Sequence, residues 1–179
     1  TGNSEMGRAI AVDNNGRVYV VGETYASDFP NTTGVEFVGV SAGYIIKLNA
    51  DATIAYSTFI SHADYVNPHA LAIDANGAVY LTGSVTRPHN DFPITNCVFQ
   101  SQPLGGNEVF IAKLNASGNT FDYLTFISGS GDEDSLGLAV DGNGVAYITG
   151  ITSSAAFPTT TGAFQTTLKT APGLNASDD

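Results

Sequence analysis

Cysteine, tryptophan and basic residues are scarce in this sequence. Its 179 residues include one cysteine, Cys97, and no tryptophan, so no disulfide can form within the chain. Six lysines and arginines stand against seventeen aspartates and glutamates, which gives a formal net charge of −11. Nucleic acids and anionic lipids need a cationic surface, so we expect neither as a partner. No apolar run approaches the roughly 20 residues of a membrane helix, and we expect no membrane insertion.

Internal repetition is the strongest feature that is present. The stretch "VDNNGRVYVVG" at 12–22 returns as "IDANGAVYLTG" at 73–83 and as "VDGNGVAYITG" at 140–150. A Phe-Pro pair follows each copy, and a second block follows the first two copies, as "YIIKLNADATIAYSTFIS" and "VFIAKLNASGNTFDYLTFIS". Self-similarity of this kind is the signature of a repeat architecture. The residues that recur in all three copies of the first block are Asp13, Gly16, Tyr19, Gly22, Asp74, Gly77, Tyr80, Gly83, Asp141, Gly144, Tyr147 and Gly150.

Each complete unit is expected to form four strands. An Asn-Gly pair between apolar runs is a strong hairpin signal, and it predicts a two-residue type I′ turn at Asn15-Gly16 and its counterparts. The preceding Asp is then expected to accept hydrogen bonds from turn amides. The "KLNASGN" stretch at 113–119 predicts a second hairpin, between the third and fourth strands.

The apolar pattern indicates that both faces of these sheets are covered. The first strand has a small face, Ala9 and Ala11, and a branched face, Ile10 and Val12. The second strand is apolar on both faces, whereas a sheet with one wet face would alternate apolar and polar residues. We therefore predict an all-β fold of four-stranded antiparallel blades of a β-propeller, with the repeated tyrosines packed between blades.

The order D-x-N-G-x-x-Y-x-x-G, then F-P, then K-L-N-A-S-G, then Y-x-T-F-I-S-G-S-G-D-E-D resembles the bacterial SBBP-type beta-propeller repeat. The resemblance covers nearly the whole chain and is most specific in the first two units. It implies secreted or cell-surface bacterial proteins, long and rich in repeats, with no common catalytic activity. It therefore brings no catalytic residues and no cofactor to this sequence.

About two and a half repeats are present, at 1–65, 66–134 and 135–179. The third lacks the "KLNASG" strand, of which only "GLNAS" at 173–177 is a faint echo. Closed propellers have four to eight blades, so this chain alone cannot close a ring. Three arrangements remain open: part of a longer propeller, a ring or fibre of several chains, or a monomer. Copies of the chain, or further repeats, are thus the expected partners.

The densest acidic cluster is "SGSGDEDS" at 128–135. Asp132, Glu133 and Asp134 could bind calcium through hard carboxylate oxygens, close to Asp28 or Asp91, or could form a solvated acidic loop. A G-x-S-x-G pattern surrounds Ser41, but a strand is expected after it where a nucleophile elbow needs a helix. His62, His69 and His89 show no zinc spacing and are expected at the surface.

These observations favour a protein that is not an enzyme. The leading hypothesis is an extracellular or cell-surface repeat module that acts as a structural, assembly or adhesion scaffold, and that could polymerise through open blade edges. The alternative is a propeller face that binds glycan or protein, with calcium as a possible cofactor. A propeller hydrolase or lyase would need a convergent acid and base pair, and no such pair recurs in the loops.

Overall fold

The computed structural model describes residues 4–168. This part of the chain forms ten β-strands and no helix. Consequently, no described segment is a helix of the length and hydrophobicity needed to cross a membrane. The strands are β1 (Glu5–Val12), β2 (Val18–Thr24), β3 (Ala42–Leu48), β4 (Ile54–Ile60), β5 (Ala63–Ile73), β6 (Val79–Pro88), β7 (Asn107–Leu114), β8 (Phe121–Ile127), β9 (Glu133–Val140) and β10 (Ala146–Thr152).

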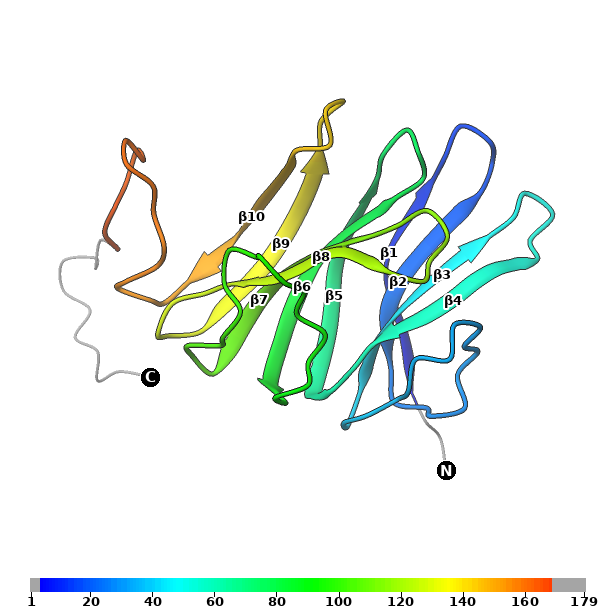
Figure 1. The fold of residues 1–179 in the computed structure, drawn as a ribbon, viewed down its shortest axis with the longest axis horizontal. Coiled ribbons are helices and arrows are strands. Elements are labelled where there is room, and N and C mark those ends of the chain that lie inside the picture. Colours follow the sequence, from blue (N-terminus) through cyan, green and yellow to red (C-terminus); the bar gives the residue numbers. More distant parts are fainter. Residues whose placement is uncertain (1–3, 169–179) are drawn as a thin grey trace.

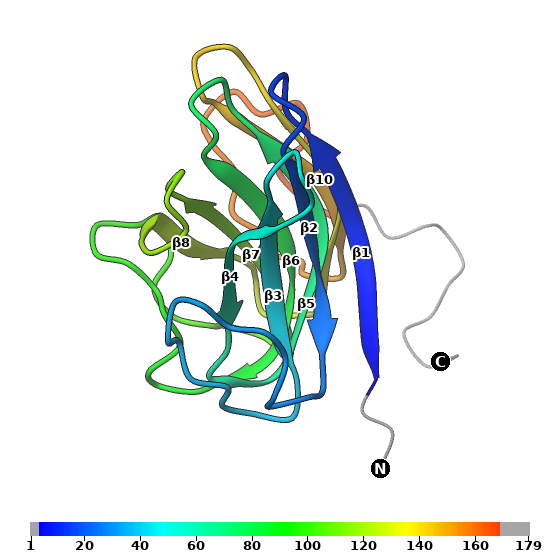
Figure 2. The ribbon, with the colours of Figure 1, turned by 90° about the vertical axis from the view of Figure 1, so that its right-hand side faces the viewer.

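The strands form three antiparallel sheets in chain order. The first is β1-β2-β3-β4, the second is β5-β6-β7-β8, and the third is the pair β9-β10. Figure 1 shows the sheets in a row, and Figure 2 looks along the row, with β1 on one side and β4 and β8 toward the other. The predicted all-β fold of blade-like repeats is confirmed. β5 and β9 begin slightly before the predicted repeat starts at 66 and 135.

The turns between the first two strands of each sheet are not of the predicted type. The amide of Gly16 donates to the Asp13 carbonyl at 3.0 Å, and the amide of Asp13 donates to the Arg17 carbonyl at 3.0 Å. Gly16 has a φ of 74°, while Asn15 does not have a positive φ. This is a three-residue loop, a type I turn followed by a left-handed glycine. The two-residue type I′ turn was therefore a wrong prediction, and the same loop recurs at Asp74 and Asp141.

The second glycine of the motif lies where two backbones approach closely. The first strand carries a bulge in each sheet, between Gly7 and Ala9 in β1 and at matching positions later. A Cβ atom at Gly22 would overlap the carbonyl oxygen of Met6 in the neighbouring strand. The same holds for Gly83 against Asn67 and for Gly150 against Asp134. Only glycine lets the second strand pair with the bulged first strand at this point.

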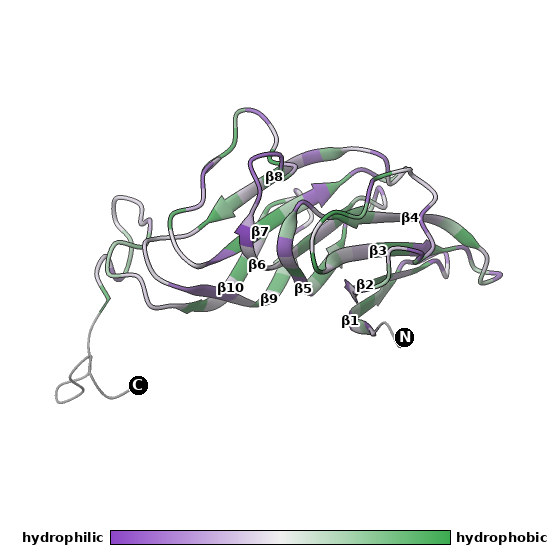
Figure 3. Cartoon of the chain, turned by 90° about the horizontal axis from the view of Figure 1, so that it is seen from below, coloured by the Kyte–Doolittle hydropathy of each residue, from purple (hydrophilic) through white to green (hydrophobic). Residues whose placement is uncertain are grey.

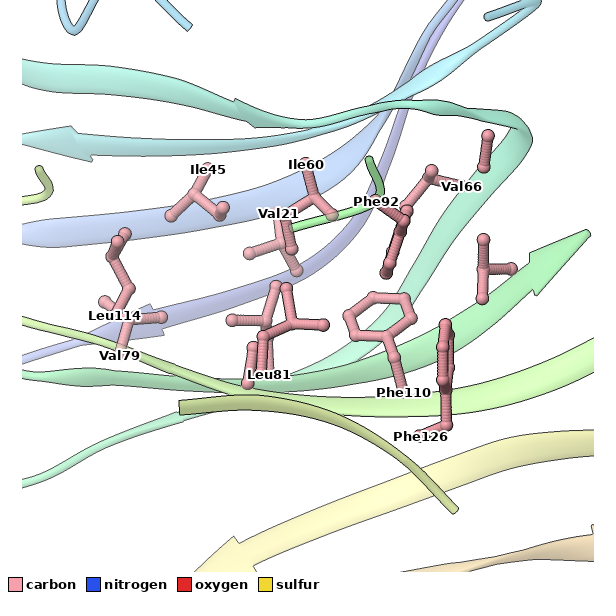
Figure 4. Close-up of a cluster of buried hydrophobic side chains, with 14 of the residues drawn as sticks. Val21, Ile45, Ile60, Val66, Val79, Leu81, Phe92, Phe110, Leu114 and Phe126 are labelled. Atoms are coloured by element: carbon pink, nitrogen blue, oxygen red, sulfur yellow. The ribbon is translucent and has the colours of Figure 1, made fainter. Parts of the chain in front are cut away.

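The main core lies between the first and second sheets. Figure 4 shows Val21, Ile45 and Ile60 of the first sheet pointing toward Leu81 and Phe110 of the second. All five side chains are fully buried. In Figure 3 the strands of all three sheets carry green, hydrophobic segments. The second sheet is thus apolar on both faces because a neighbouring sheet packs on each side.

The first sheet covers most of its outer face with its own long loop. Phe29 from this loop stacks on Tyr44 with ring centroids 4.6 Å apart, and Phe37 meets Phe59 edge to face. On this outer face, the loop does not cover β1. Its side chains Ile10 and Val12 are 68% and 60% exposed.

Candidate functional site

Each sheet carries an Asp and a Tyr that are joined through their side chains. The hydroxyl of Tyr19 donates to Asp13 Oδ2 at 3.3 Å, while Asp13 Oδ1 accepts from the amides of Asn15 and Arg17. Burial acts to raise the pKa of Asp13, but hydrogen bonds from the Arg17 amide and guanidinium and from the Asn15 amide hold this pKa below its usual value. Tyr80 with Asp74 and Tyr147 with Asp141 repeat the contact, each at 3.4 Å. The Asp therefore shapes the turn and orients the tyrosine.

The oriented tyrosine reaches the turn of the next sheet. A Cβ atom built on Gly77 would lie 3.2 Å from the hydroxyl oxygen of Tyr19, and one on Gly144 would lie 2.9 Å from that of Tyr80. Tyr19 and Tyr80 are fully buried at these junctions. The first block of the repeat thus supplies both sides of a contact between sheets: the Tyr of one sheet packs against the turn glycine of the next sheet.

We call the contact between the first and second sheets the first junction, and that between the second and third sheets the second junction. A lysine of β3 also takes part in the first junction. Lys47 pairs directly with Tyr19 across the strands, and its Nζ lies 5.1 Å from the centre of that ring and 5.6 Å from that of Tyr56. The same Nζ donates to the carbonyl of Ala116, in the turn between β7 and β8, at 3.1 Å. Lys47 is only 6% exposed, and burial lowers its pKa. The cation is held by two aromatic rings and one carbonyl group.

A second tyrosine and glycine pair lies at the outer end of this junction. The ring of Tyr56 in β4 packs on Gly118, in the turn between β7 and β8, and a Cβ atom at Gly118 would overlap the ring. Burial raises the pKa of Tyr56. Sequence reasoning missed the roles of Lys47, Tyr56 and Gly118, although the shared "KLN" of the two second blocks was a usable signal.

The second junction has fewer contacts than the first, because the third sheet has only the strands β9 and β10 in the described part of the chain. Lys113 lies 5.1 Å from the centre of the Tyr80 ring and 3.9 Å from Asp74, as Lys47 lies over Tyr19. Interaction with Tyr80 raises the pKa of Lys113. Tyr147, the third copy, is 57% exposed because no described sheet follows β10.

Comparison with known families supports the assignment of the chain as a β-propeller repeat. The family model described as the SBBP beta-propeller repeat matches residues 2–30. This chain carries an SBBP beta-propeller repeat. The matched range holds β1, the turn, β2 and the first Phe-Pro pair, so the Asp13–Tyr19 contact lies inside it. No curated protein matches the chain.

The acidic cluster at 132–134, of which Glu133 and Asp134 begin β9, has specific contacts within the chain. Glu133 is buried, and its carboxylate accepts from the Gly129 amide at 3.0 Å, from the Thr152 hydroxyl at 2.7 Å and from the Ser154 hydroxyl. The two flanking carboxylates contact other parts of the second repeat: Asp132 Oδ1 accepts from the Asn107 amide at 3.0 Å, and Asp134 Oδ1 lies 3.0 Å from His69 Nδ1.

The three carboxylates do not converge on one point, and their contacts do not include Asp28 or Asp91. Within residues 4–168, no group of three or more His, Cys, Asp or Glu side chains is arranged to hold a metal ion. Calcium binding at Asp132, Glu133 and Asp134 stays a prediction.

The remaining candidates have contacts within or beside the second sheet. His62 Nδ1 lies 2.9 Å from Asp91, and His89 Nε2 lies 3.6 Å from Asp64, while Cys97 is exposed. Ser41 is fully buried, and its hydroxyl accepts from the Val66 amide at 3.3 Å. β3 follows Ser41 directly, as the sequence predicted, so this serine lies in a strand entry rather than at a nucleophile elbow.

Two cavities lie between the second and third sheets. One has about 260 Å³ and is lined mainly by apolar side chains, among them Val109, Ile127, Ile148 and Phe157. The other has about 340 Å³ and is lined by oxygen-bearing side chains and one isoleucine, namely Asn67, Ser84, Thr86, Asn107, Asp132, Glu133, Asp134 and Ile151. The first can take apolar groups and the second can take polar groups.

Proposed function

We propose that this chain is a non-enzymatic scaffold module of the cell surface or extracellular space, which assembles with copies of itself or with further repeats. One observation carries the proposal. The same tyrosine-to-glycine junction is built twice inside the chain, at Tyr19 with Gly77 and at Tyr80 with Gly144. On the two outermost described sheets, one partner of this contact is present alone: Gly16 in the turn of the first sheet and Tyr147 in the third.

Assembly then repeats the internal junction between two copies. β5 contacts β1, β2 and β3, and β9 contacts β5, β6 and β7, so the first strand of each sheet makes the main contact with the sheet before it. A second copy would place its β1, with Ile10 and Val12, against the β9-β10 pair of the first. Its Gly16 turn would then receive the hydroxyl of Tyr147. Such a head-to-tail contact gives a ring if it closes and a fibre if it does not.

Light scattering coupled to size-exclusion chromatography tests this proposal on the full chain. We expect the average mass to rise with protein concentration, and electron microscopy to show rings or fibres. Ile10→Lys places a charge in the contact, and because Ile10 is exposed in the single chain the variant should fold. It should stay monomeric. Phe99→Lys is the matched control, since Phe99 is 66% exposed but lies outside both end faces, and it should assemble as the parent does.

A monomer at every concentration would contradict the assembly role, and so would equal assembly of the Ile10→Lys variant and the parent. The location at the cell surface rests on the SBBP resemblance and has its own test. An antibody against the chain should label intact cells of the source organism, whereas labelling only after cell lysis would contradict this part.

A second candidate function is a binding face for glycan or protein that uses calcium. It is favoured by the 340 Å³ cavity, which is lined almost entirely by oxygen-bearing side chains. Hard oxygen ligands suit calcium. Calorimetric titration with calcium should then give saturable binding that Asp132→Asn weakens and Asp28→Asn does not. Absence of heat at millimolar calcium, and no change of melting temperature with a chelator, would remove this candidate.

A further inference from the structure

We propose that an open cavity in the long loop of the second repeat binds a neutral saccharide through side-chain amides and without a metal ion. The cavity has a volume of about 460 Å³ and is lined by residues of the segment 88–103 and by Phe126 of β8. It lies apart from the cavities between the second and third sheets, and the inference depends neither on the stacking of chains nor on calcium.

The first argument is that the cavity is built by segments that are longer in the second repeat than in the others. The segment between the second glycine of the motif and the Phe-Pro pair is 84–91 here but 23–28 and 151–156 in the other repeats, which is two residues shorter. The segment from the Phe-Pro pair to the lysine of the "KLN" block is 94–112, against 31–46 in the first repeat, which is three residues shorter. Both longer segments contribute to the wall, with Pro88, His89 and Asn90 from the first and Ser101, Gln102 and Pro103 among those from the second. Insertions in single repeats often form the binding face of a repeat protein.

The second argument is that the wall presents amide groups that the loop does not use for itself. Asn90, Asn96 and Gln102 line the cavity and are exposed. None of these three side chains makes a hydrogen bond to another residue within 4–168, although the backbone carbonyl of Gln102 accepts one. Each side-chain amide offers both donors and an acceptor, and a sugar hydroxyl likewise both donates and accepts.

The corresponding loop of the first repeat uses its amide differently. Asn31 is the counterpart of Ile94, and its Oδ1 accepts from the amides of Thr33 at 3.1 Å and Gly34 at 3.2 Å. The isoleucine of the second repeat cannot make these bonds. The amides of the second loop therefore remain available to a ligand, whereas the amide of the first loop holds its own turn.

The third argument is that the loop is held in place from its buried side. The Gln100 side chain accepts from the Ser128 amide at 3.0 Å and donates to the Gln102 carbonyl at 2.8 Å. Further along the loop, the fully buried Glu108 accepts from the Leu104 amide at 2.9 Å. A site whose backbone is already fixed pays less ordering entropy when a ligand binds.

The lining indicates the class of ligand. No Asp, Glu, Lys or Arg side chain lines this cavity in the described part of the chain. His89 lines it, and Asp64 lies 3.6 Å from its Nε2 and balances its charge when it is protonated. The site therefore favours an uncharged ligand.

The apolar part of the wall narrows the class further. Phe92 and Phe126 stack with ring centroids 5.5 Å apart, and both line the cavity together with Ile94 (Figure 4 labels the two rings). The volume of 460 Å³ falls within the range of about 300–1,000 Å³ that is typical of small-molecule sites. A neutral saccharide matches this wall, because it combines hydroxyl groups with apolar C–H faces and carries no charge.

Titration of the full chain with four neutral disaccharides tests the proposal by saturation-transfer NMR. The probes are cellobiose, maltose, lactose and N,N′-diacetylchitobiose. We expect at least one of them to bind with a dissociation constant below about 5 mM. Binding should be the same in the presence of a chelator, which separates this site from the calcium-dependent candidate.

Variants of the full chain locate the binding. Asn90→Ala and Gln102→Ala each remove hydrogen bonds to the ligand and should weaken binding about three- to tenfold. Both side chains are exposed, so the melting temperature should stay that of the parent. Asn14→Ala is the matched control, since it removes an exposed amide in the turn of the first sheet, and it should bind as the parent does.

The proposal is overturned if none of the four probes binds below about 5 mM, or if the chelator abolishes binding. It is equally overturned if both cavity variants bind as tightly as the parent, or if the Asn14→Ala control loses as much affinity as they do. The stacking of whole chains is measured by mass without saccharide, so the two proposals fail separately.

Discussion

The hydroxyl of Tyr19 in the first sheet lies against Gly77 in the turn of the second, close enough that a Cβ atom there would be 3.2 Å away. Tyr80 and Gly144 repeat this relationship between the second and third sheets. The glycine thus has two tasks, since it also holds the left-handed conformation of its turn, with a φ of 81° at Gly77. A single repeated motif therefore builds the hairpin and joins it to the previous sheet.

Substitution of the turn glycines separates these two tasks. Gly144→Ala should lower the free energy of unfolding by about 2–3 kcal/mol, because the left-handed backbone disfavours Ala and the new Cβ meets the Tyr80 hydroxyl. Gly16→Ala should lower it by only about 1 kcal/mol, since its Cβ would meet only Ala50, at an ordinary 3.6 Å. Urea denaturation of both variants measures the difference, and equal losses would contradict the junction contact.

Ala52 is a position where glycine should stabilise the protein. It has a φ of 64°, in the turn between β3 and β4, and the matching residue of the second repeat is Gly118. Ala52→Gly relieves the unfavourable backbone conformation and should raise the free energy of unfolding by about 0.5–1 kcal/mol. Ala50→Gly, in the same turn but without a positive φ, should not raise it. Thermal unfolding of the two variants decides, and a loss of stability in Ala52→Gly would refute the prediction.

Glu133 should be important for the stability of the fold. Its buried carboxylate accepts from the amide of Gly129 and the hydroxyls of Thr152 and Ser154. Glu133→Ala would leave these donors without their acceptor and should lower the free energy of unfolding by about 2–4 kcal/mol. The exposed Asp28→Ala serves as control and should change it by less than about 0.5 kcal/mol. Urea denaturation tests this, and a change as small as that of the control would be evidence against the buried network.

Acid should destabilise the fold through the turn aspartates. The pKa values of Asp13 and Asp141 are both lower than usual; at Asp141 the largest cause is the hydrogen bond from the Val145 amide. A carboxyl whose pKa is lower in the folded state stabilises fully above its unfolded pKa, near 3.8, and this stabilisation is lost as the pH falls through the folded pKa. Melting temperatures should therefore fall steeply below about pH 4.

Asn variants identify the groups responsible for this acid sensitivity. Asp13→Asn and Asp141→Asn should each make the melting temperature less dependent on pH in this range, at some loss of stability at neutral pH. Asp28→Asn should keep the dependence of the parent chain. An unchanged pH profile in both turn variants would show that other carboxyls cause the acid sensitivity.

The hairpins were predictable from the sequence, but their turn type was not. The Asn-Gly pair favours a type I′ turn when only the two central residues are considered. In the structure the Asp13 carboxylate accepts from the amides of Asn15 and Arg17, and these bonds select the longer loop. A side chain outside the pair thus decided the turn, although the sequence had already pointed to that Asp as an acceptor.

Strand order, repeat number and the blade-like sheets followed from the sequence alone, because alternation of side chains and turn residues act over a few neighbouring positions. Which copies of the motif are buried was decided only by the tertiary structure. Tyr80 and Tyr147 have nearly the same local sequence, yet one is fully buried and the other is 57% exposed. The reason is that burial depends on the sheet that packs against a residue. That neighbour comes from a distant part of the chain.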